Sequence, residues 1–103
     1  MTTSSFPERI QRLEPYSERF AAFKLAASGC DVLFATYPAG TKIEEHTHPT
    51  DNWGVITRGA MFITMNGQTL RFGPGDWYHV SAGTEHSAHC DSLTEEIEFW
   101  FAA

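Results

Sequence analysis

Three histidines at two places in the chain have the spacing of metal ligands. His46 and His48 are separated by one residue in TKIEEHTHP, which reads as a strand, and His86 begins a second strand in GTEHSAHC. Side chains alternate between the two faces of a strand, so we expect His46 and His48 to project to the same side, about 7 Å apart along the chain. Two imidazoles on one face, with a further donor beside them, can hold one divalent cation. The alternative is a pair of solvated surface histidines.

The elements that must position these histidines are short strands. From Phe20 onward the chain is divided by Gly, Pro and Asn-Gly signals, and short runs rich in Val, Ile, Phe, Thr and aromatic residues lie between them. The run FITMNGQTL predicts a hairpin, because Asn66 and Gly67 suit the two positive-φ positions of a type I′ turn. We therefore predict an all-β fold: a small two-sheet, jelly-roll barrel of the double-stranded β-helix kind.

Size and charge limit the class of protein. The 103 residues predict one barrel domain over 20–103, preceded by an N-terminal arm over 1–19 with an edge strand or a helical turn. The net charge of −6 argues against nucleic acid and anionic membrane surfaces as partners. The sequence has no apolar run of about 20 residues and its first residues lack a secretory pattern, so we expect a cytoplasmic protein. Cys30 and Cys90 are expected to be free, buried thiols.

The two histidine segments resemble the two sequence motifs of the cupin superfamily. The first motif maps onto Gly40, His46-Thr47-His48, Asn52 in the position of the family's glutamate, and Gly59. The second maps onto Gly75, Ser81 in the position of a proline, Gly83, His86, and Cys90 in the position of an asparagine. The resemblance covers roughly residues 40–90, and the hairpin between the motifs agrees with it.

The resemblance implies a metal ligand set. His46, His48 and His86 match family ligands, and Asn52 occupies the fourth position, with Asp51 as the alternative; alternation along the strand lets only one of these two reach the metal. The expected cofactor is one divalent transition metal, with Fe, Mn, Ni, Zn, Co and Cu all open. Three imidazoles and an amide are neutral, so such a site keeps a net charge of +2 and favours anionic or chelating oxygen ligands.

The last strand offers a proton carrier. In TEEIEFWF, Ile97, Phe99 and Phe101 share one face, and the other face carries Glu96, Glu98 and Trp100. If the second face lines the cavity, Glu98 is a candidate general acid or base, with Trp100 as a stacking wall, a pair that also resembles one in cupins acting on keto-uronates. If the apolar face forms the core instead, the glutamates are solvated.

Further residues that could line or rim the cavity are Tyr78, Arg58, Trp53 and Met61, with Tyr78, Arg58 and Trp100 as the predicted substrate contacts. Core packing is the alternative for the aromatic residues and solvation for Arg58. His79 and His89 match no motif position and are expected to be structural.

Three functions remain open at this stage. The favoured one is a metalloenzyme of isomerase, lyase or dioxygenase type that acts on a small oxygenated organic molecule, of which an anion is one option. A non-catalytic small-ligand-binding or sensing protein is the second, and an interaction module without metal is the third. The resemblance and the need to cover exposed sheet edges also imply a homodimer in which the arm takes part.

Overall fold

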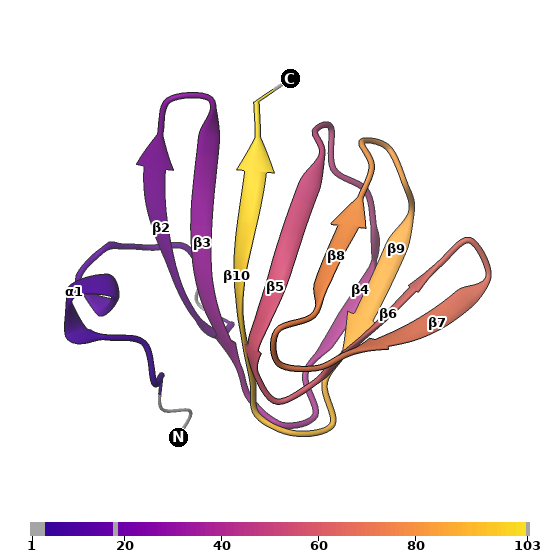
Figure 1. Cartoon of the computed structure of the whole chain (residues 1–103), viewed down its shortest axis with the longest axis horizontal. Coiled ribbons are helices and arrows are strands. Elements are labelled where there is room, and N and C mark those ends of the chain that lie inside the picture. Colours follow the sequence, from indigo (N-terminus) through magenta and orange to yellow (C-terminus); the bar gives the residue numbers. More distant parts are fainter. Residues whose placement is uncertain (1–3, 18, 103) are drawn as a thin grey trace.

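The computed structural model describes residues 4–17 and 19–102 of the chain (Figure 1). A four-residue helix α1 (Glu8–Gln11) precedes the strands, whose bounds are β1 (Glu14–Pro15), β2 (Ala21–Ala27), β3 (Cys30–Tyr37), β4 (Lys42–His46), β5 (Asn52–Arg58), β6 (Met61–Met65), β7 (Gln68–Phe72), β8 (Trp77–Val80), β9 (His86–His89) and β10 (Thr94–Phe101). The prediction of an all-β fold is confirmed. The short α1 cannot span a bilayer, and the described chain forms no other helix that could.

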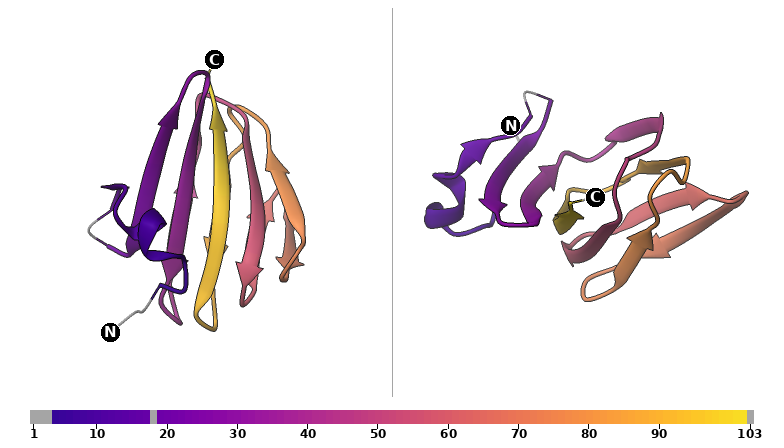
Figure 2. Two further views of the ribbon diagram at one scale, coloured as in Figure 1. Left: turned by 60° about the vertical axis from the view of Figure 1, so that its left-hand side comes forward. Right: turned by 90° about the horizontal axis from the view of Figure 1, so that it is seen from above.

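The strands form two antiparallel sheets that face each other. One sheet has the order β1-β2-β3-β10-β5-β8, and the other has the order β4-β9-β6-β7. The left view of Figure 2 shows the strands of the larger sheet next to one another, with strands of the smaller sheet behind them. The adjacent strands β3, β10, β5 and β8 are far apart in the sequence, because the chain crosses between the sheets. Residues from both halves of the sequence therefore lie next to one another in the larger sheet.

Alternation along the strands sorts the side chains. The buried core between the sheets includes Tyr37, Ile56, Met61, Ile63 and Val80. The predicted hairpin is confirmed: β6 pairs with β7, and Asn66 and Gly67 have φ values of 53° and 75°. Such positive values at both central residues match the right-handed twist of the flanking strands.

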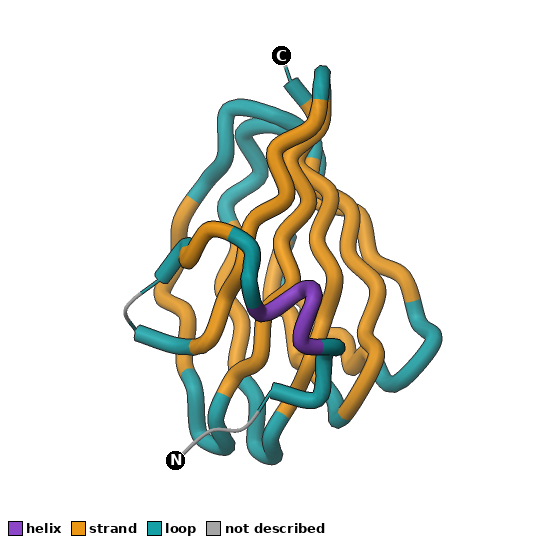
Figure 3. Tube along the Cα trace, turned by 90° about the vertical axis from the view of Figure 1, so that its left-hand side faces the viewer, coloured by secondary structure: helices purple, strands orange, loops and turns teal. Residues whose placement is uncertain are grey.

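The N-terminal arm lies on the outer side of the larger sheet (Figure 3). The Phe6 ring packs edge-on against Phe34 of β3, with 5.5 Å between ring centroids. β1 joins the sheet at its edge beside β2, and the Tyr16 amide donates to the Ala22 carbonyl at 2.8 Å. The arm therefore supplies both the predicted helical turn and the predicted edge strand.

The rest of the outer face of the larger sheet stays exposed. Large apolar side chains there include Leu25, Trp53, Trp77 and Phe101, each between 41% and 55% exposed. The stacked rings of Trp77 and Phe99 lie 5.8 Å apart. The face could support the predicted homodimer, which stays a prediction. Both cysteines are free; Cys90 is buried and Cys30 is half-buried.

Candidate metal centre

A cavity of about 180 Å³ lies between the two sheets. Its walls come from alternate positions of β3, β10, β5 and β8 on one side and of β4, β9 and β6 on the other, and Tyr16 and Phe20 close part of it from the arm side. The side chains that line it are Tyr16, Phe20, Leu33, Ala35, Tyr37, Ile43, His46, His48, Asn52, Ile63, Tyr78, Val80, His86, Ala88, Glu96, Glu98 and Trp100. The lining is thus mixed in polarity: most of its side chains are aromatic or aliphatic, and the others include three imidazoles and two carboxyls.

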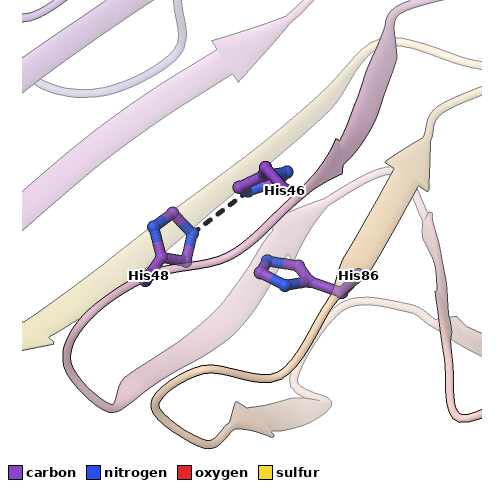
Figure 4. A group of neighbouring side chains, drawn as sticks. All are labelled: His46, His48 and His86. Atoms are coloured by element: carbon purple, nitrogen blue, oxygen red, sulfur yellow. Dashed lines mark hydrogen bonds between the residues drawn. The ribbon is translucent and has the colours of Figure 1, made fainter.

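His46, His48 and His86 converge in this cavity (Figure 4). One potential ligand atom from each lies within 4.8 Å of the other two, and the Nε2 atoms of His46 and His48 are 3.1 Å apart. Two nitrogens bound to one ion at about 2.1 Å with an angle of 90–110° lie roughly 3.0–3.4 Å apart. The His46–His48 pair therefore has the spacing of two ligands of one metal ion, and His86 lies near enough to join them after a small side-chain movement.

Backbone contacts hold the rings in place. The Nδ1 atoms of His46 and His86 lie 2.7 Å and 2.9 Å from the carbonyl oxygens of Glu44 and Thr84. A carbonyl only accepts, so each Nδ1 is protonated and donates, which leaves the Nε2 lone pair for a metal. His48 follows β4 in a loop, and its carbonyl accepts from the Gly83 amide at 2.8 Å. This bond fixes the loop of the first motif to the turn that precedes His86.

The environment favours the neutral form of His48 and His86. Burial, together with the neighbouring His46 and His86, lowers the pKa of His48 to about 4. Burial also lowers the pKa of His86, although its bond to Thr84 acts in the opposite direction. Unprotonated rings are the form that binds metal, so no proton has to be removed from these two at pH 7.

Asn52 shares this cavity, whereas Asp51 has other partners. Asn52 is 2% exposed, and in the orientation that satisfies its amide nitrogen it donates to the carbonyls of Thr50 and Asp51 at 3.3 Å and 3.2 Å. Its oxygen is then left to act as a ligand. The Asp51 carboxylate accepts from the Ala82 amide at 2.8 Å and lies 3.6 Å from His79. Asn52 is therefore the better placed of the two for a metal in the cavity.

A β-bulge in β4 decides which of its side chains enter the cavity. Ile43 pairs with Ala88 and His46 pairs with His86, so three steps along β4 match two along β9. The extra residue reverses the alternation: Ile43 and His46 line the cavity, and Glu44 is exposed. Simple alternation would have placed Glu44, an unpaired charge, on the same side as His46.

The cavity-facing side of β10 carries two carboxyl groups. Glu96 is 1% exposed, and its two oxygens accept from the hydroxyls of Tyr37, at 2.7 Å, and Tyr78. Glu98 is half-buried; the Tyr37 hydroxyl lies 3.3 Å from its Oε1, and the Trp100 indole donates to its Oε2 at 3.3 Å. Of the two arrangements open for the last strand, the structure has the one with Glu96, Glu98 and Trp100 toward the cavity.

Both carboxyls hold protons more strongly than usual. Burial raises the pKa of Glu96 well above its usual range, and the adjacent Glu98 raises it further. Burial likewise raises the pKa of Glu98, although its hydrogen bonds to Glu96, Trp100 and Tyr37 oppose that shift. Two touching carboxyls that titrate as a unit retain one proton over a range where a solvated glutamate has lost it. At a given pH the pair is therefore better able to hold and donate a proton than a solvated glutamate.

The remaining predicted contacts divide between the cavity and the outside. Trp100 and Tyr78 line the cavity, and the Trp100 ring lies 4.5 Å from that of His48. Arg58 does not line it: a bulge between Glu95 and Glu96 pairs Arg58 with Glu95, and the two side chains lie 3.8 Å apart outside the cavity. Arg58 is thus no part of the site.

Four other residues are also accounted for. Met61 belongs to the buried core, and Trp53 is exposed on the outer face with His79 stacked on it at 4.3 Å. His89 stacks on Phe62 at 4.8 Å. These contacts are structural and involve none of the cavity's polar groups.

Sequence reasoning missed several members of the cavity. Glu96 was assigned to the same face as Glu98 but given no role, and Tyr37, Tyr16 and Phe20 were not singled out. Tyr37 is at the end of DVLFATY, where alternation places it with Leu33 and Ala35, yet only the pairing of β3 with β10 brings it to Glu96. No local signal marks Tyr16, because it reaches the cavity from the arm.

The comparisons with known proteins agree with this fold and site. The family model described as "Cupin domain" matches residues 33–100. No curated protein sequence matches the chain. Among solved structures, a cupin superfamily protein from Desulfitobacterium hafniense is 17% identical with a TM-score of 0.78, over 99% of this chain and 95% of that one.

Two further similar structures are of individually named proteins. KdgF from Halomonas sp. is 19% identical with a TM-score of 0.77, over 99% of this chain and 96% of that one. Salicylate 1,2-dioxygenase from Pseudoaminobacter salicylatoxidans is 18% identical with a TM-score of 0.76; 91% of this chain aligns with 29% of that one. At these identities the likeness establishes the fold. Since the family model spans most of the sequence and includes all three histidines, the chain belongs to the cupin domain family.

Proposed function

We propose that this cupin binds one divalent transition metal through His46, His48 and His86, with Asn52 as a fourth ligand, and that it is an enzyme acting on a small oxygenated molecule. The observation that carries the proposal is the meeting of the histidine trio and Glu98 in one cavity. The similarity to a salicylate dioxygenase supports an enzymatic role, and dioxygenase, isomerase and lyase chemistry are the candidate types.

The three histidines and Glu98 would have different roles in the reaction. A divalent ion among the imidazoles would supply a Lewis acid that polarises a substrate oxygen. Glu98 would then move a proton at a carbon or oxygen next to the polarised group, because its carboxyl faces the same cavity and its raised pKa suits proton exchange near neutrality. Trp100 and Tyr37 contact that carboxyl, and Asn52 lines the same cavity from β5.

Metal binding is tested by measuring bound metal and affinity on purified protein. We expect one equivalent on the wild type, and a loss of affinity of at least about 100-fold for His48→Ala and for His86→Ala. His89→Ala is the matched control, since His89 is also on β9 but stacks on Phe62 away from the trio. Unchanged affinity in both histidine variants would show that the metal ligands are elsewhere.

Catalysis is tested with two screens on loaded protein. Oxygen uptake is followed with iron and catechol-like, thiol or diketone substrates, and keto-sugar opening is followed by NMR with zinc or nickel. Glu98→Gln should reduce turnover about 10²- to 10⁴-fold while metal affinity is retained, and Glu44→Gln, at an exposed position, should not. Turnover that survives Glu98→Gln removes Glu98 from the mechanism, and micromolar ligand binding without turnover in either screen would favour a binding or sensing protein.

A further inference from the structure

The charges in the cavity are distributed unevenly. Its polar residues include the three imidazoles and Asn52, and the Glu96–Glu98 pair of β10 with the hydroxyls of Tyr37 and Tyr78. Among the described residues that line the cavity, none is a Lys or an Arg. An anionic group that entered the cavity could therefore be neutralised only at the metal end.

The partners of the carboxyl pair are all uncharged. Tyr37 and Tyr78 donate to Glu96, and Trp100 donates to Glu98. Hydrogen bonds from neutral groups orient a carboxylate but do not cancel its charge, so none of these partners offsets the negative charge of an ionised carboxyl in the pair. The nearest charge of opposite sign would be a metal at the histidines or a group on the ligand itself.

The two carboxyls differ in the hydrogen bonds that their oxygens accept from the protein. Both oxygens of Glu96 accept from tyrosine hydroxyls, and Glu96 is almost completely buried. Both contacts of Glu98 to Tyr37 and Trp100 are long, at 3.3 Å, and Glu98 is only half-buried. Long hydrogen bonds are weak, so Glu98 keeps acceptor capacity that a ligand in the cavity can use.

Tyr78 and Tyr37 hold the buried member of the pair in place. Gly54 on β5 lies directly opposite Tyr78, and its missing side chain leaves the room in which the Tyr78 ring reaches Glu96. Tyr37 donates to Glu96 from β3 and also lies 3.3 Å from Glu98. Glu96 is thus fixed by two tyrosines, and Glu98 beside it presents its carboxyl to an incoming ligand.

These observations specify the kind of ligand that fits. We propose that the cavity binds a small molecule whose end away from the three histidines carries a hydroxyl or ammonium group and no anionic group; this rests on the metal-dependent function proposed above. A hydroxyl would donate to the free acceptor positions of Glu98. An ammonium group would do the same and would also offset one negative charge of the pair. A second carboxylate would meet Glu98 without any cation to offset the repulsion.

Matched four-carbon carboxylates test the proposal on zinc-loaded protein. Each probe presents one carboxylate to the metal, and the distal group is the hydroxyl of 4-hydroxybutanoate, the ammonium of 4-aminobutanoate or the second carboxylate of butanedioate. Isothermal titration calorimetry should show the first two binding at least tenfold more tightly than butanedioate.

The variant Glu98→Gln tests whether the acid pair causes this preference. With one equivalent of zinc retained, the dissociation constants for the hydroxyl and dicarboxylate probes should come within about threefold of each other. Glu44→Gln, which changes an exposed carboxyl near the metal loop, should keep the wild-type preference. Equal or tighter binding of butanedioate by the wild type, a preference that persists in Glu98→Gln, or no binding of any probe at 20 mM would overturn the proposal.

Zinc binding is measured first, so that the two proposals can fail separately. If no zinc binds, the metal-dependent function is refuted, and the distal preference is tested on metal-free protein with butylammonium, 1-butanol and butanoate. The preference then stands if butylammonium or 1-butanol binds at least tenfold more tightly than butanoate, and it is overturned otherwise. If zinc binds but no preference is found, only the ligand class inferred here is wrong.

Discussion

Gly54 of β5 lies against the ring of Tyr78, and Gly54→Ala is expected to disturb the whole acid pair. A Cβ atom there would come within 2.5 Å of the Tyr78 Oη and closer still to Cζ and Cε2. Ordinary contacts between carbon atoms are about 3.5–4.0 Å, so the ring must move by about 1 Å. Tyr78 is 7% exposed and its hydroxyl donates to Glu96, which leaves no free direction for the movement.

The expected cost combines overpacking with a weakened hydrogen bond. Overpacking a core costs about 1–3 kcal/mol, and a hydrogen bond to a charged group contributes about 1.5–3 kcal/mol. We expect a loss of about 3 kcal/mol or more in the free energy of unfolding. For a domain of this size that corresponds to a fall in Tm of about 12 °C or more.

The assay is thermal and urea unfolding of Gly54→Ala beside Gly73→Ala. At Gly73 the nearest atom to an added Cβ is the Arg71 Nη1, at 3.2 Å, the end of a flexible side chain that can move away. Gly73→Ala should therefore change stability by less than about 1 kcal/mol. A Tm for Gly54→Ala within 2 °C of the wild type would refute the argument that Tyr78 is fixed between Gly54 and Glu96.

Three other predictions concern charge and assembly. The pKa of Glu98 is raised in the folded state, so its protonated form stabilises the fold below the unfolded pKa, and that stabilisation is lost as pH rises through the folded pKa. Urea unfolding at pH 5.5 and pH 8 should therefore show a smaller decrease in the free energy of unfolding for Glu98→Gln than for the wild type. Glu95→Gln should weaken the anchoring of the arm by Ser5, so trypsin should cleave within residues 9–12 faster than in the exposed control Glu14→Gln. The predicted homodimer is checked by light scattering, where Trp77→Glu should yield monomer if the exposed outer face forms the interface, and a wild-type monomer at 100 μM would contradict it.

Much of the fold was predictable because its signals are local. Gly, Pro and Asn-Gly mark the strand ends, and a turn such as Asn66-Gly67 needs only its own residues to determine the hairpin. The histidine trio was predictable for a related reason: its spacing within two short motifs is a property of the sequence. Their convergence within 4.8 Å agrees with that prediction.

The polar wall opposite the histidines could not be predicted in the same way. Tyr37, Glu96 and Tyr78 come from three strands whose order in the sheet, β3-β10-β5-β8, follows from crossovers between sheets. Two bulges also defeat simple alternation: one turns Glu44 outward, and the other places Arg58 beside Glu95. A bulge adds one residue without a strong sequence signature, so the face of every residue beyond it is uncertain until the pairing is known.

Glu95 and Glu96 show how strand geometry gives adjacent, identical residues opposite properties. Glu95 is buried on the outer side, where burial raises its pKa but hydrogen bonds from Ser5 and Thr36, with Arg58 nearby, more than offset that effect and lower the pKa. Glu96 faces the cavity, where burial and Glu98 raise its pKa despite two tyrosine donors. As pH falls, Glu95 therefore loses its stabilising charge while the cavity pair is relieved of repulsion. The same Glu-Glu step thus attaches the arm on one side of the sheet and keeps a proton beside the metal centre on the other.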